Sequence, residues 1–107
     1  MKHFGRKIVN PEPFSEAYNL TAARAIKKAV SVPVFLVGGM VKPATMEKII
    51  GDGDAGYISL SRALIADPEF PEKIRSGSLE PSRCIHCNLC MAYLTKRPVR
   101  CYHGKRI

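Results

Sequence analysis

The sequence contains no tryptophan, and none of its four cysteines precedes residue 84. It also has no apolar run longer than a handful of residues, so no segment is expected to span a bilayer. The stretch after Met1 lacks the apolar core of a secretory signal. We therefore predict a cytoplasmic protein without membrane contacts, where clustered thiols more often bind metals or carry redox chemistry than form disulfides.

The chain has 107 residues, of which 46% are apolar and 24% charged. These are ordinary values for a globular protein and exclude a disordered or collagen-like chain. A chain of this length has room for one modest hydrophobic core. We divide it into a flexible arm at residues 1–13, an α/β unit at residues 14–78 and a basic, cysteine-rich extension at residues 79–107.

Acidic residues are missing from the last part of the chain. All nine lie at or before Glu80, where eleven Lys and Arg leave a balance of +2, and the other six cations follow without any acid. We interpret this basic excess as a local complement to metal-bound thiolates, because nearby cations lower thiol pKa values. An RNA-binding zinc knuckle is the rival interpretation, but the segment offers only Tyr93 and Tyr102 for stacking on bases, so nucleic acid is not the expected partner.

The cysteines follow a C-x2-C-x2-C-x10-C spacing and are Cys84, Cys87, Cys90 and Cys101. Such spacing is typical of a metal centre, because three thiols share one tight loop and a fourth returns from nearby. A four-iron four-sulfur cluster fits this ligand set, and structural zinc fits nearly as well. Free or disulfide-forming thiols are the plain alternative, and His86 and His103 are expected to be solvated rather than ligands.

Hydrophobic periodicity predicts alternating helices and strands. The expected helices are 14–30, 43–50, 61–66 and 68–75, and the expected strands are 32–37 and 57–60. Ser15 is expected to cap the first helix and Asp67 the last. The first strand is a nearly continuous apolar run, which is typical of a parallel strand buried on both faces.

This order predicts an α/β fold built on a right-handed βαβ unit with two parallel strands. A barrel needs eight strands, so the unit amounts to part of one. Both edges of a two-stranded sheet are bare, and we expect them to be covered by self-association or by a missing barrel half.

Two stretches carry a family resemblance. Pro33-Val34-Phe35-Leu36-Val37-Gly38-Gly39 and Leu64-Ile65-Ala66-Asp67-Pro68, followed by Cys84-Ile85-His86-Cys87-Asn88, resemble the last two βα units and the iron–sulfur motif of Old Yellow Enzyme-like NADH:flavin oxidoreductases, in the branch of 2,4-dienoyl-CoA reductase. The resemblance implies the C-terminal part of a TIM-barrel flavoenzyme. In such an enzyme FMN passes a hydride from NAD(P)H to an activated alkene, and the cluster relays electrons.

By this resemblance the FMN phosphate site includes Gly38, Gly39, Ser61 and Arg62. The chemistry agrees, because glycines allow close backbone approach, a helix start adds positive charge and an arginine forks onto phosphate. Arg62 could instead pair with Asp67 or Glu69. Since most of the barrel is absent, we expect no catalysis by this chain alone. A non-catalytic metal-binding or interaction module with a basic segment is the alternative function.

Overall fold

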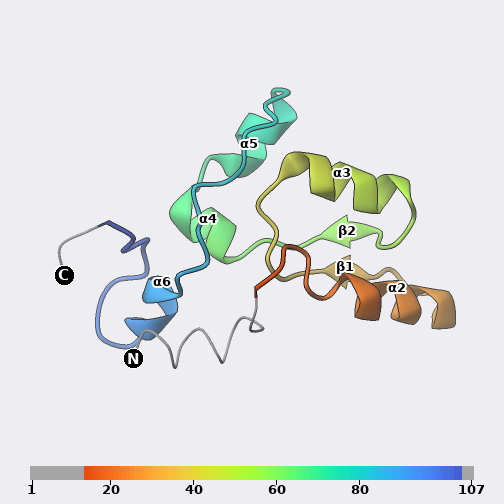
Figure 1. Cartoon of the computed structure of the whole chain (residues 1–107), viewed down its shortest axis with the longest axis horizontal. Helices are drawn as coiled ribbons and strands as arrows, with labels where there is room; N and C mark the ends of the chain where they lie inside the picture. Colours follow the sequence, from red (N-terminus) through yellow and green to blue (C-terminus); the bar gives the residue numbers. More distant parts are fainter. Residues whose placement is uncertain (1–13, 105–107) are drawn as a thin grey trace.

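The computed structural model describes residues 14–104, so the arm predicted at residues 1–13 and the last three residues lie outside the described part. The elements follow the order α2 (Leu20–Ala29), β1 (Phe35–Leu36), α3 (Pro43–Gly51), β2 (Tyr57–Ile58), α4 (Arg62–Ala66), α5 (Phe70–Arg75) and α6 (Leu89–Ala92) (Figure 1). The strands pair in parallel, Phe35 with Tyr57 and Leu36 with Ile58. The predicted α/β unit with two parallel strands is therefore present.

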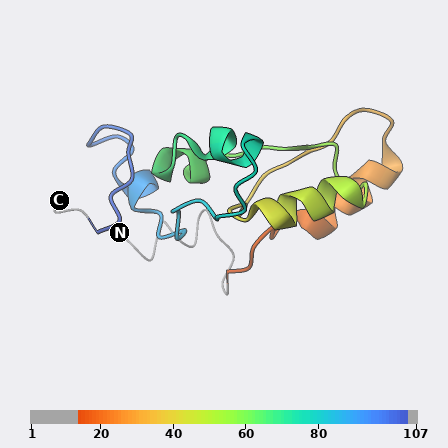
Figure 2. The same cartoon turned by 90° about the horizontal axis from the view of Figure 1, so that it is seen from above.

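Helices α2 and α3 lie side by side on one face of the two strands, and no helix of the described chain covers the other face (Figure 2). Leu36 points to the helices and is 2% exposed, whereas Phe35 is 60% exposed. The expectation of a strand buried on both faces is therefore wrong for this chain. A parallel strand is buried on both faces only where a second layer covers the sheet.

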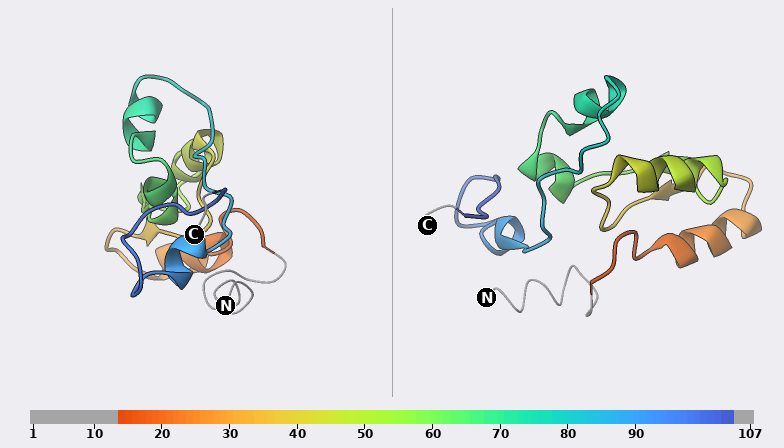
Figure 3. Two further views of the ribbon diagram at one scale, coloured as in Figure 1. Left: turned by 90° about the vertical axis from the view of Figure 1, so that its left-hand side faces the viewer. Right: turned by 45° about the horizontal axis from the view of Figure 1, so that its top comes forward.

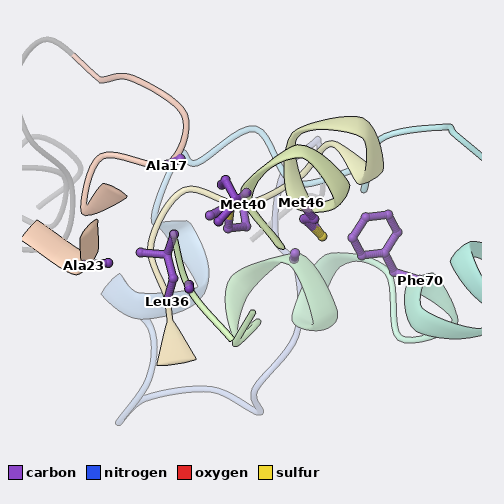
Figure 4. Close-up of a cluster of buried hydrophobic side chains, with 9 residues drawn as sticks. Ala17, Ala23, Leu36, Met40, Met46 and Phe70 are labelled. Carbon is purple, nitrogen blue, oxygen red and sulfur yellow. The ribbon is translucent and has the colours of Figure 1, made fainter. Parts of the chain in front are cut away.

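The hydrophobic core lies between the strands and the helices. It consists of Ala17, Ala23, Leu36, Met40, Met46, Ile49, Ala55, Ala63 and Phe70 (Figure 4). Phe70 is 1% exposed and anchors α5 on this core, with Met46 of α3 pointing toward it. Burying one such side chain contributes about 1.5–3 kcal/mol.

Two predicted helix starts are wrong. The first helix begins at Leu20 after a turn, with Asn19 rather than Ser15 at the cap position. The turn places the backbone N–H of Ala17 on Gly39 O and so joins it to the loop after β1. The last predicted helix begins at Phe70 with Glu69 at its cap, because the Asp67 carboxylate binds Lys73 instead of the helix start.

The N-terminus of α3 is capped from a distance. The Glu16 carboxylate accepts hydrogen bonds from Val41 N at 3.2 Å, Lys42 N at 2.9 Å and Thr45 Oγ1 at 2.7 Å. The Glu16 carboxylate thus binds the backbone N–H of the cap residue Lys42, that of the preceding Val41 and a first-turn hydroxyl, from about 25 positions earlier. This contact fixes the segment before α2 against the loop that follows β1.

The cysteine-rich segment runs back past α4 to α6, which lies on the side of the molecule toward which both strands run (Figures 1 and 3). Ser82 secures this path, because its hydroxyl donates to Ala63 O at 2.8 Å and its N–H donates to Val41 O. Carboxyl ends of parallel strands are where α/β proteins bind ligands. Within residues 14–104, no helix is both long and apolar enough to cross a membrane.

Candidate phosphate pocket and cysteine cavity

A pocket of about 150 Å³ lies at the carboxyl ends of β1 and β2. The loop after β1 forms one wall and the loop after β2 with the start of α4 forms the other. All four residues assigned to the phosphate site by sequence resemblance line it, namely Gly38, Gly39, Ser61 and Arg62. Residues more than twenty positions apart meet here because parallel strands end at the same edge of the sheet.

Gly38 and Gly39 are required by the geometry of the first wall. Their φ angles are +120° and +69°, values that side chains other than glycine rarely accept. A Cβ on Gly38 would lie 2.8 Å from Asn19 Nδ2 and 2.9 Å from Tyr18 Cζ. The side chains of Tyr18 and Asn19, which precede α2, can approach the loop this closely only because both positions lack a side chain.

Only some of the backbone N–H groups in this wall have a partner within the described part of the chain. Val41 and Lys42 donate to the Glu16 carboxylate, so the predicted contribution of this helix start to an anion is already taken by an internal one. The helix after β2 has only five residues and adds little dipole. The N–H groups of Gly39 and Met40 donate no backbone hydrogen bond to another residue of the described range, and both residues line the pocket.

Arg62 supplies the positive charge of the pocket. It is 8% exposed, its Nη1 donates to Asn88 Oδ1 at 2.5 Å, and its Nη2 lies 3.5 Å from the Tyr18 hydroxyl. The alternative pairing with Asp67 or Glu69 is wrong, because Asp67 binds Lys73 at 3.1 Å and lies 3.8 Å from Arg83. Within residues 14–104 no carboxylate forms an ion pair with Arg62. A buried guanidinium held by neutral groups favours an anionic ligand.

Sequence reasoning missed two side chains of this pocket, Tyr18 and His86. His86 has a left-handed backbone with φ +58° and stacks on Phe14 at 4.3 Å. Burial, followed by the charge of Arg62, lowers the pKa of His86. The expectation that His86 is solvated is therefore wrong, whereas His103 is exposed as expected. Nothing in the local sequence around His86 signals the stacking, since Phe14 lies 72 residues earlier.

The four cysteines surround a second, smaller cavity of about 20 Å³. It is lined by Cys84, Cys87, Cys90 and Cys101 together with Arg62 and Asn88. Burial raises the pKa of Cys84 and of Cys90 above the ordinary value of a thiol. The positive charge of Arg62 opposes this rise at both thiols. The described residues contain no group of three His, Cys, Asp or Glu side chains arranged to hold a metal ion.

Three arginines of the C-terminal segment contact groups other than the thiols, and Lys105 and Arg106 lie outside the described residues. Arg97 lies over the Tyr93 ring at 5.3 Å and Arg100 over the Tyr102 ring at 5.6 Å. Arg83 donates to Ala66 O at 2.9 Å. Among the described cations, Arg62, which precedes the segment, is the one whose charge opposes the rise in the pKa of Cys84 and of Cys90.

The chain is similar in sequence to several known proteins. Residues 5–80 match the NADH:flavin oxidoreductase / NADH oxidase family. The chain is 35% identical over 91 residues to a 4,4'-dithiodibutanoate disulfide reductase of Rhodococcus erythropolis, covering 85% of this chain and 22% of that protein. It is 40% identical over 83 residues to an NADH oxidase of Thermoanaerobacter brockii, covering 77% and 13%.

A metal reductase of Desulforamulus reducens is also 40% identical, over 96 residues that cover 87% of this chain and 14% of that protein. The chain thus spans less than a quarter of the length of each of these three relatives. The family match covers more than half of the chain. The chain therefore belongs to the NADH:flavin oxidoreductase / NADH oxidase family.

Proposed function

We propose that this chain is the part of an FMN-dependent NAD(P)H oxidoreductase of the ene-reductase type that holds the FMN phosphate. The observation that carries the proposal is the buried Arg62 guanidinium facing a pocket whose other wall is Gly38 and Gly39. Charge from an arginine combined with free amide N–H groups is the usual protein solution for binding phosphate. FMN, when bound, supplies the capacity to accept and donate a hydride.

The residues of the pocket have separate roles in this proposal. Arg62 binds the phosphate oxygens, Gly39 and Met40 donate their N–H groups, and the Ser61 hydroxyl adds a further donor at the pocket rim. Tyr18 and His86 close the pocket side walls and keep water from the buried guanidinium. No residue of this set carries out the redox reaction, so the chain binds the cofactor but does not turn over substrate alone.

The names of the relatives support a shared binding role rather than a shared substrate. Proteins that contain a similar segment are named for reducing a disulfide, a metal, bilirubin or cinnamate. We infer that the remaining barrel strands select the substrate that is reduced. The segment described here serves the cofactor binding that these enzymes share. The remaining strands would cover the open face of β1 and β2, either as another part of the polypeptide or as another chain.

We also propose that the four cysteines hold an iron–sulfur cluster. A single tetrahedral zinc needs its thiolates about 3.8 Å apart, from a Zn–S distance of about 2.3 Å, whereas in a cluster each thiolate binds a different iron and the sulfurs stand further apart. Support for the cluster comes from the four cysteines that line one cavity, because thiolate is the usual ligand of iron in such clusters. Anaerobically purified protein with iron and broad visible absorbance supports this assignment, and stoichiometric zinc without iron overturns it.

The phosphate assignment is tested by titrating the chain with FMN and with riboflavin, which differ by the phosphate alone. We expect FMN to bind and riboflavin to bind at least tenfold more weakly. Arg62→Ala should abolish the difference, and Lys48→Ala is the matched control because it removes a positive charge from the exposed side of α3. Equal affinity for both flavins, or no FMN binding at millimolar concentration, contradicts the proposal and favours a non-catalytic interaction module.

A further inference from the structure

One hydrogen bond connects the pocket at the strand ends with the cysteine cavity. Arg62 lines both, and its Nη1 donates to Asn88 Oδ1 at 2.5 Å. Asn88 is 3% exposed and belongs to the cysteine loop, one position after Cys87. The charge that faces the pocket is therefore held from the cysteine side.

The backbone of Asn88 explains why its side chain is available for this contact. Its φ is +63°, a left-handed value that asparagine accepts more readily than most residues. Asn88 stands at the cap position of α6 and its carbonyl accepts from Ala92 N at 2.9 Å, but its side chain makes no capping bond. The amide oxygen is instead directed to the guanidinium, 26 residues earlier in the chain.

The chemistry of the acceptor matters as much as its position. The second contact of the guanidinium, to the Tyr18 hydroxyl, is 3.5 Å long and therefore weak. A neutral amide oxygen fixes the arginine without cancelling its charge, whereas a carboxylate would do both. Fixing a flexible arginine before binding lowers the entropy lost when an anion arrives.

We propose that Asn88 is the positioning residue of the phosphate pocket, so that the fold of the cysteine loop sets the affinity of Arg62 for a phosphate group. The inference rests on the proposed function, because it assumes that the pocket takes phosphate. It assigns Asn88 no contact with the ligand. Any event that rearranges the Cys87–Cys90 turn then weakens binding in the neighbouring pocket through the loss of this one bond.

Two substitutions separate positioning from simple structural support. Asn88→Gly keeps a left-handed backbone available and removes the acceptor, and we expect the affinity for FMN and for inorganic phosphate to fall about three- to tenfold. Asn88→Asp retains an acceptor but adds a negative charge. We expect it to match or exceed the parent chain in thermal stability while losing at least tenfold in phosphate affinity, a split that a purely structural residue does not produce.

Nitrogen NMR of the Arg62 guanidinium gives a readout that needs no ligand. In the parent chain its Nη protons should exchange slowly with water, and in Asn88→Gly they should exchange at least several times faster. Unchanged exchange, or unchanged phosphate affinity in both variants, overturns the inference. If the parent chain binds neither FMN nor phosphate, the proposed function fails, and the exchange measurement still decides whether Asn88 holds Arg62.

Discussion

The rings of Phe35 and Tyr57 stack at 4.4 Å with an interplanar angle of 11°, on the face of the sheet that the helices leave open. They are 60% and 53% exposed, although they are direct partners in the parallel register. In a closed barrel this face would be turned toward the interior. The pair thus marks the surface on which the remaining strands of the proposed enzyme would pack.

We predict that the isolated chain associates with itself through this face at tens of micromolar. Phe35→Glu should weaken the dimer at least tenfold, because it places a charge where the dimer would bury the phenyl ring. Leu79→Glu is the control, since Leu79 is 65% exposed in the segment after α5. Sedimentation equilibrium measures both variants, and a stable monomer of the parent chain at this concentration would contradict the prediction.

Replacing the distant cap of α3 should destabilise the chain. Glu16→Ala removes the acceptor of three hydrogen bonds, and we expect the free energy of unfolding to fall by about 1–2 kcal/mol. Glu16→Gln keeps an oxygen acceptor but not the charge. Its free energy of unfolding should lie between those of the parent chain and Glu16→Ala. Urea denaturation gives the values. Glu47→Ala, an exposed position of the same helix, should change stability by less than about 0.5 kcal/mol.

The buried carboxylate of Asp67 predicts an asymmetric double-mutant cycle. Its side chain is 3% exposed, whereas those of Lys73 and Arg83 are 44% and 71% exposed. Lys73→Met leaves a buried charge poorly compensated and should cost about 1–3 kcal/mol of stability. Asp67→Asn leaves cations that water can solvate and should cost less. The double variant should be more stable than additivity predicts, and strict additivity in thermal unfolding would disprove the coupling.

Acid should remove the ion pair between Arg24 and Asp54, which lie 3.0 Å apart. The hydrogen bond from Arg24 holds the pKa of Asp54 below its ordinary value. The bond therefore contributes its stability in full above that ordinary value and loses it as the pH falls through the lowered one. Asp54→Asn should be less stable than the parent at pH 7 and equal to it in strong acid. A difference that stays constant from pH 7 to pH 2 would refute this origin.

The two glycines of the pocket wall should resist substitution, unlike Gly51 at the end of α3. Gly38→Ala and Gly39→Ala force a left-handed backbone on alanine and press its Cβ against Tyr18, so each should lose about 1 kcal/mol or more and weaken FMN binding. Gly51→Ala is the matched control. No atom lies within 4 Å of its added Cβ and it ends α3, so this change should stabilise by about 0.5–1 kcal/mol. Calorimetry without FMN measures the loss of stability, and calorimetry with FMN measures the loss of binding.

Part of the α/β unit follows from local sequence rules. The helix predicted at residues 43–50 agrees within one residue with the observed bounds of α3, Pro43–Gly51. This prediction succeeded because hydrophobic period and turn residues lie within a few positions of the helix that they specify. The site residues Gly38 and Ser61 came from the family resemblance, and they line one pocket because parallel strands end at the same edge of the sheet.

The errors share a different origin. Ser15 has the chemistry of a helix cap, yet the turn before α2 packs on the loop of Gly39 and moves the helix start to Leu20. Asp67 also resembles a cap, but Lys73 and Arg83 converge on it from two segments. In each case a contact outside the helix start outweighed a local preference for a cap, namely Ala17 with Gly39 and Asp67 with Lys73.

By itself the sequence determined the order of helices and strands, the glycines that the strand-end loop requires and the grouping of four cysteines, because backbone conformation and hydrophobic period are local properties. Only the tertiary structure decided that Arg62 is buried without an ion pair to any carboxylate of residues 14–104 and that Asn88 holds it. It also decided that Phe35 and Tyr57 face outward. These relationships depend on which segments meet in space, and burial energy from the whole core selects that arrangement.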